Sequence, residues 1–223
     1  LGNLNTDIKI SKQEDRLAYS GKLETENFNL GSLTNNSKLG KITFNLDVNG
    51  NHRKQHYPQI TMKGLIASIE YSQYAYQNIT LDGEYKQGGF NGKLVLDDVN
   101  GSIALNGSFN TAGTTPTFDF LATHNHVRPH DLNLKPQYEN AESSARLKAN
   151  FTGGAIDEMN GEINLDSLYF KQADKEYFLK NFKVKAINEH GKDKSLAITS
   201  NFLSGNIAGD YSYSTLTARI LNT

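Results

Sequence analysis

The chain has 223 residues, with 23 basic and 24 acidic side chains and a formal net charge of -1. Because phosphate binding needs a concentrated positive surface, this balance argues against a nucleic-acid partner. The chain has no cysteine, which excludes disulfides and thiolate metal sites. Its apolar runs are far shorter than the ~20 residues of a membrane-spanning helix.

Apolar and polar residues alternate along most of the chain, and this period of two predicts β-strands. The predicted strands, in chain order, are 8–10, 17–23, 42–48, 60–71, 79–85, 90–96, 103–109, 118–122, 145–151, 163–170, 178–186, 196–202 and 207–213. Helical signal is weak, and only 30–38 and 129–134 are expected to hold a turn or two of helix.

Short connections rich in Asn and Gly separate these strands. They lie at 48–51, 87–89, 99–101 and 189–191. Asn and Gly tolerate the positive φ that tight hairpins need, so we expect an antiparallel meander.

Two stretches about a hundred residues apart resemble each other. Asn181 follows Asn78 by 103 residues, and Gly209 follows Gly107 by 102. A fixed period indicates stacked like units rather than a closed enzyme fold. We assign 38–110 to a first repeat unit, 111–144 to a connection and 145–214 to a second unit. The whole of 1–223 is expected to be an internal segment of a longer protein.

Each predicted strand has one apolar face, and no amphipathic helix is available to cover it. Such a face must pack on another sheet, close on itself or hold a non-protein ligand. We expect an all-β, elongated and strongly bent antiparallel sheet with an apolar concave face and one or two short helices. Glycines on that face (Gly83, Gly92, Gly107 and Gly209) favour strong curvature. Its open edge strands would favour self-association.

The apolar face supplies the candidate lipid-binding residues. They are Ile42, Phe44, Leu46, Val48, Ile79, Leu81, Leu94, Leu96, Ile103, Leu105, Phe109, Leu147, Phe151, Phe182, Val184, Ile198, Ile207 and Tyr211. The alternative reading is that these side chains form an ordinary packed protein core.

Several stretches share one style of degenerate repeat. They are 21–33 (GKLETENFNLGSL), 39–50 (LGKITFNLDVNG), 76–85 (YQNITLDGEY), 90–94 (FNGKL), 151–157 (FTGGAID) and 161–168 (GEINLDSL). This text resembles the AsmA-like family, and most closely its TamB branch (translocation and assembly module subunit) of Bacteroidetes-type bacteria. The resemblance covers most of the chain, but 124–131 departs from it.

The resemblance implies a taco-shaped β-sheet with a hydrophobic interior, in the periplasm of a Gram-negative bacterium. It implies an inner-membrane anchor outside this segment, phospholipid acyl chains as ligands and an Omp85-type outer-membrane barrel as partner. The expected function is a non-enzymatic, cofactor-free conduit or scaffold for inter-membrane phospholipid transport, for outer-membrane protein assembly, or for both. The alternative is a structural or adhesive β-sandwich repeat of a cell-surface protein.

The stretch HNHVRPHD at 124–131 is the one constellation with the shape of a chemical site. On a regular strand His124 and His126 share a face, as two imidazole metal ligands would, with His130 or Asp131 as a third. The alternative is a polar strand end with solvated imidazoles. A hydrolase built on this cluster is the least favoured function.

Overall fold

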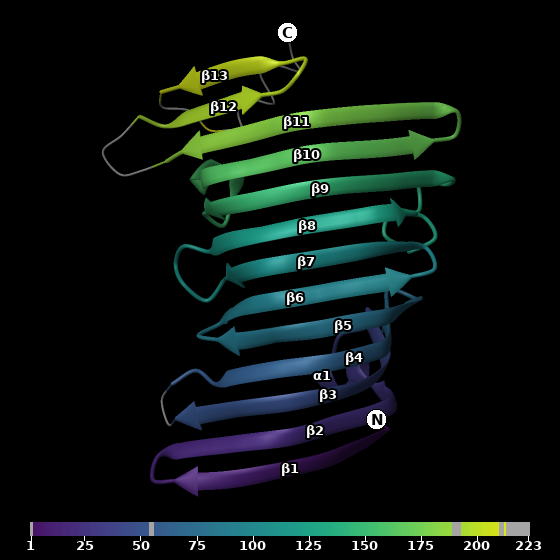
Figure 1. The fold of residues 1–223 in the computed structure, drawn as a ribbon, viewed down its shortest axis with the longest axis vertical. Helices are drawn as coiled ribbons and strands as arrows, with labels where there is room; N and C mark the ends of the chain where they lie inside the picture. Colours follow the sequence, from purple (N-terminus) through teal and green to yellow (C-terminus); the bar gives the residue numbers. More distant parts are fainter. Residues whose placement is uncertain (1, 54–55, 189–192, 210–211, 213–223) are drawn as a thin grey trace.

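A computed structural model describes residues 2–53, 56–188, 193–209 and 212. These residues form one antiparallel sheet of 13 strands, in which each strand pairs with its neighbours in sequence (Figure 1). The all-β prediction is confirmed. The strands are β1 (Asn3–Gln13), β2 (Arg16–Asn29), β3 (Leu39–Arg53), β4 (Gln59–Tyr71), β5 (Tyr74–Lys86), β6 (Gly89–Asp98), β7 (Gly101–Asn110), β8 (Thr117–Val127), β9 (Ala141–Thr152), β10 (Asn160–Gln172), β11 (Lys175–Ile187), β12 (Ser195–Thr199) and β13 (Ser204–Ala208).

Two of the predicted hairpin turns are confirmed, at 87–88 and 99–100. The turn predicted at 48–51 is wrong, because these residues lie inside β3. Gly50 pairs with Tyr19, and a Cβ on Gly50 would lie 2.5 Å from Cζ of the Tyr19 ring. The glycine therefore makes room for a ring rather than for a turn. The turn predicted at 189–191 lies outside the described residues.

The predicted helical turn at 30–38 is confirmed as α1 (Leu30–Thr34). Oδ1 of Asn29 accepts a hydrogen bond from the backbone N–H of Ser32 at 2.8 Å, and Asn35 ends the helix with φ 52°. The stretch 129–134 forms turns instead of a helix, and a short 3-10 helix, η1 (Ile156–Glu158), follows β9.

The sheet runs without a break through 111–144, the stretch assigned to a connection. This stretch contains β8 and the beginning of β9, and β8 pairs along its length with β7 and β9. The repeated sequences therefore lie in one continuous sheet.

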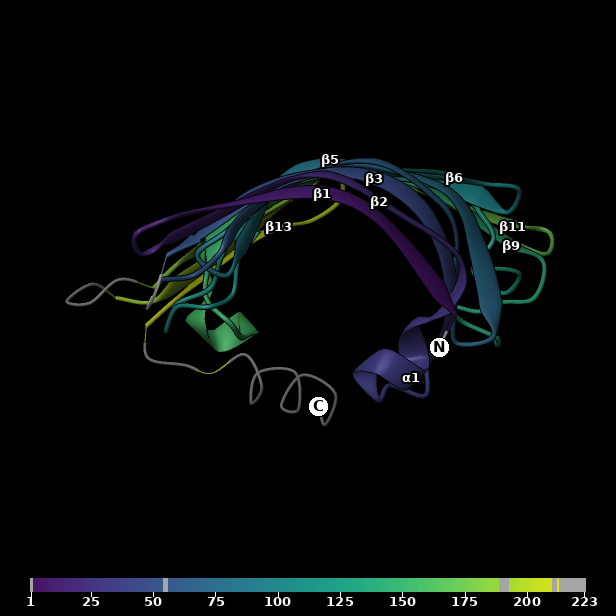
Figure 2. The same cartoon turned by 90° about the horizontal axis from the view of Figure 1, so that it is seen from below.

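The sheet is bent into an arch, and α1 and η1 lie on its concave side (Figure 2). One residue with φ between 49° and 54° interrupts every third strand: Asn27 in β2, Asn78 in β5, His126 in β8 and Asn181 in β11. Register shifts accompany Asn27 and His126. Such irregularities bend a strand. Asn78 and Asn181 are also the pair related by the sequence repeat.

Burial shows which side chains point into the arch. Ile42, Leu46 and Val48 are 7%, 8% and 6% exposed, whereas the alternating residues Asn45 and Asp47 are exposed. Within the described residues no second sheet covers the apolar side. Side chains of a single layer bury one another only where the sheet bends towards them. We therefore assign the apolar side chains to the concave face and the polar ones to the convex face.

Candidate functional site

Cross-strand pairing aligns the apolar side chains of the concave face in rows that cross the strands. The aromatic row consists of Tyr85, Phe90, Phe109, Phe118 and Phe151, each directly opposite the next on β5 to β9. The ring centroids of Phe90 and Phe109 are 5.6 Å apart, and the stacked rings of Phe118 and Phe151 are 4.7 Å apart. Neighbouring aromatic pairs of this kind stabilise a sheet.

A glycine row lies beside the aromatic row. Gly83, Gly92 and Gly107 are opposite one another on β5, β6 and β7. A Cβ on Gly83 would lie 2.5 Å from Cζ of Phe90, so that ring covers the glycine backbone. Aromatic rings that cover glycines are a known device of curved sheets. The face therefore combines a raised aromatic strip with a low glycine strip.

The leucine row lies next to the glycine row. Leu81, Leu94 and Leu105 are directly opposite one another, and the row continues through Ala122 to Leu147. These leucines are half-buried. In a single-layer sheet the remaining exposure opens into the arch, so the row offers an apolar strip that crosses consecutive strands.

The structure places the predicted lipid-facing residues in three classes of exposure. Five are buried, two are exposed, and the rest of those described are half-buried. The buried ones are Ile42, Leu46, Val48, Ile79 and Leu96; the half-buried ones are Phe44, Leu81, Leu94, Ile103, Leu105, Leu147, Phe151, Phe182, Val184 and Ile198; the exposed ones are Phe109 and Ile207. Tyr211 lies outside the described residues.

The candidate lipid-binding residues chosen from the sequence do not include several members of the same face. Cross-strand pairing adds Ile60, Met62, Ile66, Tyr85, Phe90, Phe118, Phe120 and Leu165 to it. Their alternation within each strand was visible, but only the register shows that they continue the rows.

The segment 128–140 covers the concave face near one end of the strands. Leu132 is fully buried, and its carbonyl accepts a hydrogen bond from the Tyr76 hydroxyl at 2.8 Å. Tyr76 is opposite Ile69, which is opposite Ile42, so the contact lies on the apolar face. This segment therefore narrows the uncovered part of the concave face.

A hydrogen-bonded cluster fixes the strand ends beside this segment. The Tyr74 hydroxyl donates to Oδ1 of Asp98 at 2.5 Å, and the backbone N–H of Gln77 donates to Oδ2 of Asp98 at 3.1 Å. Asp98 is buried. Burial, together with the hydrogen bond to Asp98, raises the pKa of Tyr74 to about 12. These bonds satisfy the carboxylate, so we assign the cluster a structural role.

The two candidate metal ligands in β8 have separate partners. Nε2 of His124 lies 2.9 Å from Oγ of Ser143, and Nδ1 of His126 lies 2.7 Å from Oε1 of Glu142. Ser143 and Glu142 are adjacent on β9 and so face opposite sides. The positive φ of His126 and the register shift beside it break the alternation that predicted a shared face.

His130 is engaged elsewhere, with Nδ1 2.8 Å from the carbonyl oxygen of Pro136. Asp131 pairs with Arg128 at 3.8 Å. Within the described ranges no group of three or more His, Cys, Asp or Glu side chains is placed to hold a metal ion. Burial lowers the pKa of His124, which favours the neutral imidazole on the apolar face.

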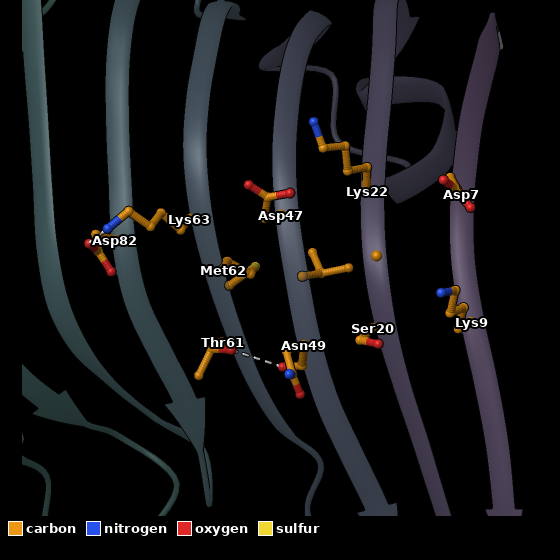
Figure 3. A pocket seen from close by; sticks show the side chains of 12 residues that line it. Asp7, Lys9, Ser20, Lys22, Asp47, Asn49, Thr61, Met62, Lys63 and Asp82 are labelled. Atoms are coloured by element: carbon orange, nitrogen blue, oxygen red, sulfur yellow. Dashed lines mark hydrogen bonds and ion pairs between the residues drawn. The ribbon is translucent and has the colours of Figure 1, made fainter.

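The convex face carries a row of charges that alternate in sign. Asp7, Lys22, Asp47, Lys63 and Asp82 are opposite one another on β1 to β5 and line a shallow depression (Figure 3). Nζ of Lys63 lies 2.8 Å from Oδ2 of Asp82. Opposite charges on paired strands stabilise the pairing, so this row is explained by the sheet itself.

No protein-family model, curated protein or solved structure matches this chain. None of the helices in the described part of the chain is long and apolar enough to cross a membrane.

Proposed function

We propose that this chain is a non-enzymatic segment whose concave apolar face shields lipid acyl chains from water. The observation that carries the proposal is the half-buried leucine row, which crosses consecutive strands. Among the described residues, no second sheet covers this row. Transfer from water to an apolar surface gains roughly 0.8 kcal/mol per CH₂. An acyl chain on this row gains that energy without directional bonds and is free to slide along it.

The dimensions of the sheet suit an elongated path. Thirteen strands at about 4.8 Å spacing extend the concave face over roughly 60 Å. The resemblance to AsmA-like and TamB proteins supports the same reading. On that basis we propose a periplasmic location in a Gram-negative envelope, an inner-membrane anchor outside this segment, and an Omp85-type barrel as partner.

Lipid capture at single positions tests the proposal. A photo-crosslinking amino acid at Leu94 points into the concave face, whereas the same group at the adjacent Val95 points to the convex face. With the protein expressed in a bacterial periplasm, we expect mass spectrometry to find phospholipid attached at position 94 and little at position 95. Equal capture at both positions, or none at either, would refute lipid shielding.

A second measurement uses purified, delipidated protein and a fluorescent fatty acid or phospholipid. We expect Leu94→Gln to weaken binding several-fold and Val95→Gln to leave it unchanged, because only the first puts a polar group on the apolar face. The adhesive β-sandwich alternative requires two facing sheets, and the described residues form one. A chain that fails to bind either probe would instead fit a structural spacer.

A further inference from the structure

In the part of the chain that the structure describes, β1 is an edge strand of the sheet and is eleven residues long. Among the described strands β1 pairs only with β2, so half of its backbone N–H and C=O groups face outwards. Side chains on a strand alternate between its faces, so the register with β2 places Leu4, Ile8 and Ile10 on the concave face. Asp7 and Lys9 lie on the convex face (Figure 3). The strand contains no proline. Such an edge is a template for another strand.

We propose that the β1 edge binds the β1 edge of a second copy of this chain, antiparallel and centred on Ile8. In this register Ile8 meets Ile8 of the second copy, Asp7 meets Lys9, and Lys9 meets Asp7. The whole of β1 is paired, and each residue faces a partner on the same side of the sheet. The interface is isologous, with a two-fold axis through Ile8.

Charge selects this register over the nearest alternatives. A shift that keeps the faces matched moves the pairing by two residues. One such shift places Asp7 opposite Asp7, and the other places Lys9 opposite Lys9. Like charges directly opposite destabilise a strand pair, whereas opposite charges stabilise it. No ion pair occupies the side chain of Asp7 or Lys9 within the described chain, so both are available to the second copy.

The dimer would continue both faces across the two-fold axis. The alternating charges of the convex face, which end at Asp7 on β1, would carry on into the second copy. Ile8 of each copy would join the two concave faces into one. The kind of charge pairing that aligns strands inside the sheet therefore also specifies its extension, whatever the concave face binds.

Cysteine crosslinking of the full chain tests the register. Because the chain has no cysteine, each introduced thiol is the only one present. We expect Ile8→Cys to form a disulfide dimer under mild oxidation. Thr6→Cys should stay monomeric alone but crosslink when mixed with Ile10→Cys, because position 6 meets position 10 of the other copy. Thiols at position 6 of both copies would be four residues apart, beyond disulfide reach.

Charge reversal tests the specificity by sedimentation. We expect a weak, concentration-dependent dimer whose dissociation constant rises about tenfold or more in Asp7→Lys and in Lys9→Asp. An equimolar mixture of the two variants should restore the affinity, since opposite charges again face each other. Circular dichroism verifies that each variant is folded.

Three results would overturn the proposal. They are a chain that stays monomeric at high concentration, a dimer unaffected by both charge reversals, and equal crosslinking of Thr6→Cys and Ile8→Cys. The second result would place self-association on another surface, such as β13.

Discussion

Gly107 shows how a missing side chain shapes the concave face. Its φ is 142°, and a Cβ at this position would lie 2.2 Å from the carbonyl oxygen of Asp119 on β8. The close approach of the two strands and the low glycine row both depend on this residue.

We predict that Gly107→Ala lowers the free energy of unfolding by roughly 2 kcal/mol or more, because it combines backbone strain with a backbone clash. Gly205→Ala is the matched control, since no atom lies within 4 Å of its Cβ position. Urea denaturation of both variants measures the difference. An equal, small loss of stability in both variants would mean that β7 and β8 can move apart to make room for the added methyl group without a loss of free energy.

Tyr74 provides a prediction about alkaline stability. Its pKa is raised from 10.0 to about 12 by burial and by the hydrogen bond to Asp98. The folded protein therefore holds the hydroxyl proton more tightly than the unfolded chain does. This contribution to stability is complete below pH 10 and is lost as the pH rises from 10 to 12.

We predict that the free energy of unfolding falls less steeply between pH 10 and pH 12 in Tyr74→Phe than in the wild type. Tyr57→Phe, at an exposed tyrosine, should retain the wild-type slope. Denaturant unfolding at several pH values gives the comparison. Identical slopes in all three proteins would contradict it.

At the scale of elements, the segment 128–140 places one fully buried side chain, that of Leu132, against the sheet. We predict that Leu132→Ala costs about 3 kcal/mol and exposes this segment to protease, because it leaves a cavity under the Tyr76 contact. Leu134, 45% exposed, is the control, and its substitution by Ala should change stability little. If both variants resist protease equally, the segment is held by other contacts.

The strands and their order were largely predictable because one-sided burial imposes a period of two on each strand. The rows of side chains that cross the strands were less predictable. Phe109 was chosen as a candidate lipid-binding residue, but its cross-strand neighbours Phe90 and Phe118 were not. The sequence of a single strand does not show which residues of the next strand it pairs with. Asn49 and Gly50 were predicted to form a turn because the local sequence does not show why a glycine is needed there. The reason is the ring of Tyr19, which is thirty-one residues away from Gly50 in the sequence.

The irregular positions were equally hidden. His126 lies in a strand with φ 49°, and nothing in its immediate sequence marks the reversal of alternation that follows. Three of the four such positions carry Asn, the residue other than glycine that most readily adopts this conformation. Only the matching of Asn78 with Asn181 by the repeat offered a signal.

At the scale of the whole molecule, each strand of the described residues pairs only with its neighbours in sequence, as in repeat proteins. We predict that stability is unequal along the sheet. Amide hydrogen exchange should be fastest in β12 and β13, which have five residues each, and slowest in the long strands β3 to β10. Uniform protection across all 13 strands would indicate a single cooperative unit.

Because each described strand pairs with its neighbours in sequence, the length of the sheet grows in proportion to the number of strands. Gain or loss of one six-strand repeat, such as β5 to β10 with its two irregular positions Asn78 and His126, changes the length by about 29 Å and leaves the cross-section unaltered. Duplication of a gene segment therefore adjusts the span in fixed steps, without redesign of the curvature. The length of such a sheet is therefore set by the number of six-strand repeats that it contains.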